Sequence, residues 1–145
     1  MAKRSSRKKS RRGAAEAPLC NCALLCDDVV ISQGRGKHSL DGVIGSIFVP
    51  RLPAVLGGYV TYIRLTNIYR NQKVTVSLDH ADSEQSVFEF EATLPPHSDP
   101  LGICTLIVPI RPFGVTVAGR YIFSVKSNRV PLAQSPISIQ TPSVP

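Results

Sequence analysis

The sequence predicts an all-β protein, a single antiparallel β-sandwich of about eight strands preceded by a disordered basic arm. From Leu19 onward, apolar runs of strand length are separated by Gly, Pro, Asn and Asp, and no stretch of useful length has helical periodicity. Within several runs apolar and polar residues alternate, which is typical of strands that bury one face. A chain of 145 residues is long enough for one ordinary core, so we expect one domain.

The basic arm is the first element of the chain. Residues 1–12 (MAKRSSRKKSRR) hold seven of the 17 basic residues and no acidic residue, whereas residues 13–145 hold 10 of each sign. After Met1 the arm has no large apolar side chain, so packing cannot offset the conformational entropy that ordering would remove. The seven basic residues are Lys3, Arg4, Arg7, Lys8, Lys9, Arg11 and Arg12.

The sandwich is expected over residues 19–141, between an arm and linker over residues 1–18 and a tail over residues 142–145. Turn residues at Gln33-Gly34-Arg35-Gly36 predict a hairpin between the first two strands. The proline-flanked segment 50–58 cannot be a central strand, so we expect it to cross between sheets. The eight predicted strands are Asn21–Ile31, Ser39–Val49, Tyr59–Ile68, Lys73–Leu78, Val87–Thr93, Ile103–Ile110, Gly119–Lys126 and Pro136–Gln140.

Alternation also assigns the faces of the strands. In the fourth strand Lys73, Thr75 and Ser77 point away from the core, because their apolar neighbours point into it. Gly119-Arg120-Tyr121 is typical of the Gly-x-Tyr start of a late strand in immunoglobulin-like domains, so we expect an immunoglobulin-like sandwich. The side chains predicted to be buried are Val74, Val76, Leu78, Phe88, Phe90, Tyr121, Phe123, Val125, Ile137 and Ile139.

Three cysteines at the start of the sandwich raise the question of a metal site. In an extended strand Cys20, Cys22 and Cys26 point to one face, about 6.6 Å apart for every two residues, which is poor geometry for tetrahedral zinc. Reduced cysteine behaves as a small buried hydrophobe. The sequence therefore favours core packing and predicts no metal and no cofactor; the alternative is a metal site completed by Cys104.

A catalytic site is disfavoured by the spacing of the polar residues. Asp27 and Asp28 are adjacent and face opposite sides of a strand, and the chain has neither H-E-x-x-H nor G-x-S-x-G. We therefore do not expect an enzyme, and a hydrolase that uses Asp27, Asp28, His38 and Asp41 is the less favoured alternative. The loop 34-GRGKHS-39 departs from the phosphate-binding P-loop pattern, so Arg35 and Lys37 are interpreted as solvated cations and as secondary anion contacts.

Three ordered motifs resemble an uncharacterised family of small, mainly bacterial proteins with a domain of unknown function. They are Ala23-Leu24-Leu25-Cys26-Asp27-Asp28-Val29, then Gly36-Lys37-x-Ser39-Leu40-x-Gly42-Val43, then Ile47-Phe48-Val49-Pro50-x-Leu52-Pro53-Ala54. Gly119-Arg120-Tyr121-x-Phe123 and the last strand are also similar to that family. The resemblance spans about residues 21–140; it implies a β-sandwich and no known activity, and it transfers no catalytic residue.

The charge distribution favours a non-catalytic binding or adaptor module. A basic arm on a neutral body is suited to hold nucleic acid or another polyanion without reading its sequence, while the sandwich binds an unknown protein partner. The alternatives are a merely solubilising arm and a small coat protein that packages nucleic acid. No secretory signal or membrane-spanning stretch is predicted, so we expect a cytoplasmic protein with reduced cysteines and no membrane partner.

Overall fold

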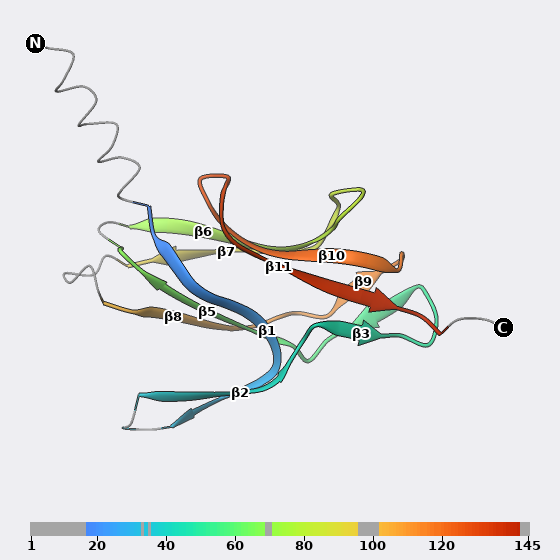
Figure 1. Cartoon of the computed structure of the whole chain (residues 1–145), viewed down its shortest axis with the longest axis horizontal. Helices are drawn as coiled ribbons and strands as arrows, with labels where there is room; N and C mark the ends of the chain where they lie inside the picture. The colour runs from blue at the N-terminus through green and yellow to red at the C-terminus, as the bar shows by residue number, and fades with distance from the viewer. Residues whose placement is uncertain (1–16, 33, 35, 69–70, 96–101, 143–145) are drawn as a thin grey trace, which may run out of the picture.

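A computed structural model describes residues 17–32, 34, 36–68, 71–95 and 102–142 (Figure 1). All regular structure in these ranges is β-strand, which confirms the all-β prediction. No helix in the described chain is long and apolar enough to cross a membrane. The eleven strands are β1 (Leu19–Ser32), β2 (Lys37–Val43), β3 (Ser46–Phe48), β4 (Ala54–Leu56), β5 (Val60–Thr66), β6 (Gln72–His80), β7 (Ser86–Leu94), β8 (Cys104–Pro109), β9 (Phe113–Val115), β10 (Gly119–Ser127) and β11 (Val130–Gln140).

The strands form two larger sheets and one small one. The four-stranded sheet has the order β2-β1-β5-β8, and the five-stranded sheet has the order β3-β11-β10-β6-β7. A two-stranded sheet joins β4 to β9. Every neighbouring pair is antiparallel except β3 with β11, which is parallel, so the prediction of a purely antiparallel arrangement is wrong at that edge.

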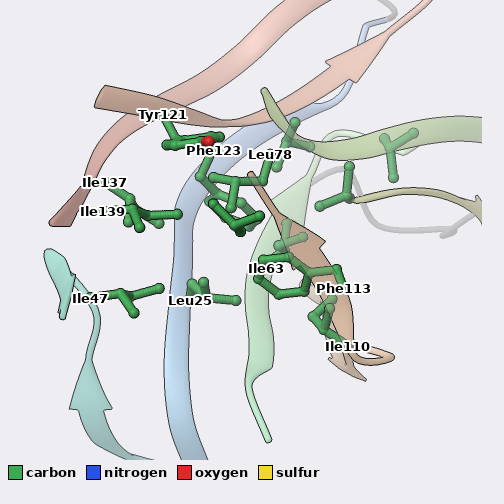
Figure 2. Packing of buried hydrophobic residues seen from close by; sticks show 14 of the residues in the cluster. Leu25, Ile47, Ile63, Leu78, Ile110, Phe113, Tyr121, Phe123, Ile137 and Ile139 are labelled. Carbon is green, nitrogen blue, oxygen red and sulfur yellow. The ribbon is translucent and has the colours of Figure 1, made fainter. Parts of the chain in front are cut away.

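One hydrophobic cluster contains side chains from both larger sheets (Figure 2). Leu25 and Ile63 come from the four-stranded sheet, and Leu78 and Phe123 come from the five-stranded sheet. The predicted inward faces of β6, β10 and the end of β11 are all buried, because alternate residues of a strand face the same side. Phe88 and Phe90 are only partly buried, since β7 is an edge strand with a neighbour on one side.

The prediction of about eight strands is wrong, because the described chain has eleven, including β4 and β9, which the sequence did not predict. The segment predicted as one strand over Ser39–Val49 is two strands, because the chain leaves the four-stranded sheet after Val43 and joins the five-stranded sheet at Ser46. The last strand begins at Val130 and contains two prolines. It tolerates them because β3 pairs only with its final three residues, so its earlier part has a free edge. The segment 50–58 crosses from the five-stranded sheet to the four-stranded sheet, as predicted, and contains the short strand β4 on the way.

Candidate functional site: a charged trough

The outer face of the five-stranded sheet forms a trough of about 830 Å³. The β6–β7 and β10–β11 hairpins rise from the sheet on either side of it (Figure 1). Because the apolar residues of β6 and β10 point into the core, their polar neighbours point into the trough. Its lining residues are Lys73, Thr75, Ser77, Asp79, His80, Ala81, Glu84, Ser86, Glu89, Glu91, Ile122, Ser124, Lys126, Asn128, Arg129 and Gln134.

Two serines lie at the floor of the trough. Ser77 of β6 and Ser124 of β10 are cross-strand partners, and both are buried although they are on the outward face. Their burial follows from the curvature of the sheet and from the longer side chains around them. The floor therefore offers small hydroxyl groups, which donate and accept hydrogen bonds.

The end of the trough next to the β6–β7 turn is acidic and held by hydrogen bonds. The carboxylate of Asp79 accepts from the hydroxyl of Ser77 at 3.2 Å and from the hydroxyl of Ser86 at 2.5 Å. Nδ1 of His80 accepts the backbone N–H of Ser83 at 3.2 Å. The N–H of Glu84 donates to the carbonyl of His80 at 2.8 Å, which closes the turn. These bonds fix Asp79 and the backbone at Glu84 before any ligand arrives.

The His80 ring also packs edge to face on Tyr121, with ring centroids 5.0 Å apart. Tyr121 is buried in the core. The acidic end of the trough is thereby connected directly to the core of the protein.

The opposite end of the trough is basic. Lys126 of β10 lies opposite Thr75, and Lys73 is two positions before Thr75 on β6. Glu91 of β7 lies opposite Thr75 on the other side, so this end also holds one carboxylate. Arg129 is in the two-residue turn between β10 and β11, where both turn residues have positive φ, 50° at Asn128 and 66° at Arg129. Asparagine tolerates this conformation, whereas the second position of such a turn favours glycine. Within the described chain no ion pair joins these three cations to a carboxylate.

Of the predicted anion-binding residues, the structure describes only Lys37. All seven cations of the arm, and Arg35, are outside the described residues. Lys37 is exposed at the start of β2 and does not line the trough. The arm and its polyanion therefore stay predictions.

Two residues of the alternative hydrolytic site are neighbours, and the other two have different partners. Asp28 and Asp41 are direct cross-strand partners on β1 and β2, and both are exposed. The carboxylate of Asp27 lies against Gly42. His38 has a different partner: its Nδ1 and the hydroxyl of the buried Tyr62 share a hydrogen bond of 2.7 Å.

The cysteines differ from one another in packing. The prediction that Cys20, Cys22 and Cys26 share one face is wrong for Cys20, because a register shift follows it. Cys20 packs against the main core cluster and Cys22 does not. Cys26 is fully buried, as predicted. Burial raises the pKa of the thiols of Cys20, Cys26 and Cys104, which keeps them protonated and weakly reactive.

Among the described residues no group of three or more His, Cys, Asp and Glu side chains is placed to hold a metal ion. The four cysteines are all free thiols. The prediction of a metal-free protein stays a prediction.

Sequence reasoning assigned Lys73, Thr75 and Ser77 to the outward face but missed the trough. Glu89, Glu91 and Lys126 occupy outward positions of alternating strands, so their orientation was predictable. The curvature of the sheet and the height of the two hairpins depend on contacts distant in sequence. The position of Arg129 in a turn was predictable from the local sequence, because Ser-Asn-Arg-Val separates two apolar runs as a short turn does.

Residues 21–140 match the model of a protein family that is described as a family of unknown function (DUF6941). No curated protein matches the chain.

Proposed function

The chain belongs to the DUF6941 family, and because that family's function is unknown, we propose a function from the structure and the charge distribution: a non-catalytic binding module. Its body binds a protein partner in the trough. Its basic arm binds nucleic acid or another polyanion. The observation that carries the proposal is the trough itself, a concave surface with a buried hydroxyl floor and charged walls.

The topology supports an immunoglobulin-like sandwich for the body. The order β1-β5-β8 corresponds to strands A, B and E of that fold, and β11-β10-β6-β7 corresponds to G, F, C and C′. The hydroxyl of Tyr121, at the start of β10, donates to the carbonyl of Val117. This contact is the tyrosine corner of immunoglobulin domains, in the strand that corresponds to F. On this assignment the trough covers the G-F-C-C′ face.

The free charges of the trough support binding by this face. A charged side chain that already has an ion-pair partner loses that partner when a ligand arrives, whereas Lys73, Lys126 and Arg129 have none to lose. The acidic end of the trough supports binding further. Its turn is already held by hydrogen bonds, so less conformational entropy is lost there when a ligand binds.

The charge density of the basic arm supports the proposed binding of nucleic acid or another polyanion. Seven cations in twelve residues, joined to a body with equal numbers of basic and acidic residues, concentrate the positive field in one segment. Free thiols agree with a reducing compartment, so we place the protein in the cytoplasm.

Site-specific photo-crosslinking in the native cells tests the trough as the partner surface. A photoreactive amino acid replaces Gln134, an exposed residue of the trough, or Ser39, an exposed residue of β2 outside it. We expect a protein adduct of defined mass from position 134 that persists after nuclease treatment, and none from position 39. Equal labelling from both positions, or labelling of nucleic acid alone at position 134, contradicts the proposal.

A further inference from the structure

Most charges of the trough are arranged by sign along the strands. The exceptions are on β7, where Glu91 is opposite Thr75 and Glu89 is opposite Ser77. Lys73, Lys126 and Arg129 lie at the end where β6 begins and β10 ends. Asp79 and Glu84 lie at the opposite end, where β6 turns into β7. The trough is thus a dipolar surface: three cations outnumber Glu91 at one end, and the other end is acidic.

The strand register gives the length of this dipole. Lys73 and Asp79 are six positions apart on β6, and at about 3.3 Å per residue they are separated by about 20 Å along the strand. Lys126 lies opposite Thr75, two positions from Lys73 and four from Asp79, while Ile122 lies opposite Asp79. An extended peptide has the same rise per residue, so opposite charges about six residues apart on it match the two ends.

We propose that the trough binds an extended polypeptide segment of the partner that carries acidic side chains at one end and basic side chains about six residues away. The acidic side chains pair with Lys73, Lys126 and Arg129, and the basic side chains pair with Asp79 and Glu84. The polar floor hydrogen-bonds the segment between them. This inference rests on the proposed function, whose partner it describes.

The charges of the trough disfavour three other ligands, which are nucleic acid, the basic arm and an apolar peptide. Nucleic acid along the trough meets Asp79 and Glu84 at one end, and Glu89 and Glu91 along the β7 wall. The basic arm of this or a second copy meets three cations at the other end. An apolar peptide gains little, since the two floor residues are serines. A segment with both signs of charge is complementary to both ends.

The backbone conformation of Arg129 supports a binding role for the basic end of the trough. Its φ of 66° is a conformation in which a side chain is disfavoured and glycine is not. A glycine there relieves the backbone and removes the guanidinium at once. Arg129→Gly therefore separates a binding role from a structural one, because it is expected to keep or increase stability while it weakens binding.

Fluorescence anisotropy with the full chain and labelled synthetic peptides tests the proposal. The probe peptide has two glutamates and, six positions later, two lysines, separated by serine and threonine. The controls have the same length with four glutamates, four lysines or no charge. We expect the dipolar peptide to bind about tenfold tighter than each control at low salt, and the difference to shrink as salt screens the charges.

Variants of the protein locate the binding. Arg129→Gly is expected to weaken the dipolar peptide about fivefold, and Lys126→Ala with Arg129→Gly more strongly. Arg120→Ala is the matched control, because Arg120 is an exposed cation of the same β10 strand that does not line the trough. It should leave the affinity within about twofold.

Three results overturn the inference. They are equal binding of the uniformly acidic peptide, binding of single-stranded DNA that Arg129→Gly abolishes, and no preference for the dipolar peptide over the neutral one. If photo-crosslinking from position 134 still captures a protein partner in the last case, the proposed function stands and only the dipolar description of its partner is wrong.

Discussion

The carboxylate of Asp27 lies against Gly42: a Cβ atom added to Gly42 would overlap Oδ2 of Asp27 and lie 2.8 Å from its Cγ. Gly42 also has a φ of 64°. The two residues face each other across β1 and β2, in a gap between the paired residues Cys26–Val43 and Asp28–Asp41. Glycine is favoured here because the backbone has a positive φ and because a side chain would have to displace the carboxylate of Asp27.

Gly42→Ala should therefore destabilise the protein more than a positive φ alone explains. We expect the free energy of unfolding to fall by about 2–3 kcal/mol, of which about 1 kcal/mol comes from the backbone. Gly34→Ala is the matched control, since Gly34 has a φ of 76° with no atom near its Cβ position. Urea unfolding measures both variants. Equal losses at the two positions would mean that Asp27 moves aside freely.

The hydroxyl of Tyr121 allows a second test, because removing it leaves the ring in the core. Tyr121→Phe loses the hydrogen bond to the carbonyl of Val117, and we expect a loss of about 1–1.5 kcal/mol. Tyr59→Phe is the control, since Tyr59 makes ring contact with Phe113 and its hydroxyl has no hydrogen bond in the described chain. That variant should change stability by less than about 0.5 kcal/mol. The tyrosine-corner assignment fails if the two substitutions have the same effect.

Alkaline pH should weaken the fold. Burial raises the pKa of Cys20, Cys26 and Cys104 above 9.0, and the pKa of Tyr59 and Tyr121 above 10.0. Each group ionises more readily in the unfolded chain than in the folded one. Their contribution is therefore complete below the unfolded pKa and is lost as pH rises through the folded pKa.

We expect the free energy of unfolding to decline from about pH 9 upward under reducing conditions. Chemical unfolding at a series of pH values measures the slope, and Cys26→Ala should make it shallower because one buried thiol is removed. A slope that does not change on removing Cys26 would show that this thiol ionises equally well in both states.

The alternation of apolar and polar residues predicted part of the fold and missed another part. The inward faces of β6 and β10 followed from the sequence because each alternates strictly, as in Val74, Val76 and Leu78. The change of sheet between Val43 and Ser46 did not, because the apolar pattern continues through Ile44 while the backbone turns. The alternation within a strand indicates which side chains are buried. Which strands pair with one another depends on residues that are distant in sequence.

The candidate site was less predictable for the same reason. The trough takes its charges from three strands and two turns, and Lys73 is more than fifty positions from Lys126 and Arg129, so the three cations form no sequence motif. Conversely, the cysteine run that stood out in the sequence is packed in part against the core, because the register shift after Cys20 turns that residue inward.

The arm gives the last prediction. If all seven of its cations meet phosphates of duplex DNA, the logarithm of the binding constant should fall with the logarithm of the salt concentration with a slope of about −6, from about −0.9 per neutralised charge. Replacing Lys8, Lys9, Arg11 and Arg12 by Ala should remove a little over half of that slope. Binding should not depend on the DNA sequence, because the arm has no aromatic side chain to stack on bases.

Two controls locate this binding on the chain. Lys37→Ala should change the slope by about one unit only if the β1–β2 hairpin also meets a phosphate. Arg129→Gly should leave the slope unchanged, because the proposed ligand of the trough is a protein segment and not nucleic acid. A chain that begins at Ala17 and still binds DNA with the full slope would place the polyanion site on the body. The loss of DNA binding in the arm variants, with peptide binding at the trough intact, would establish two separate sites, because only separate sites lose their ligands independently.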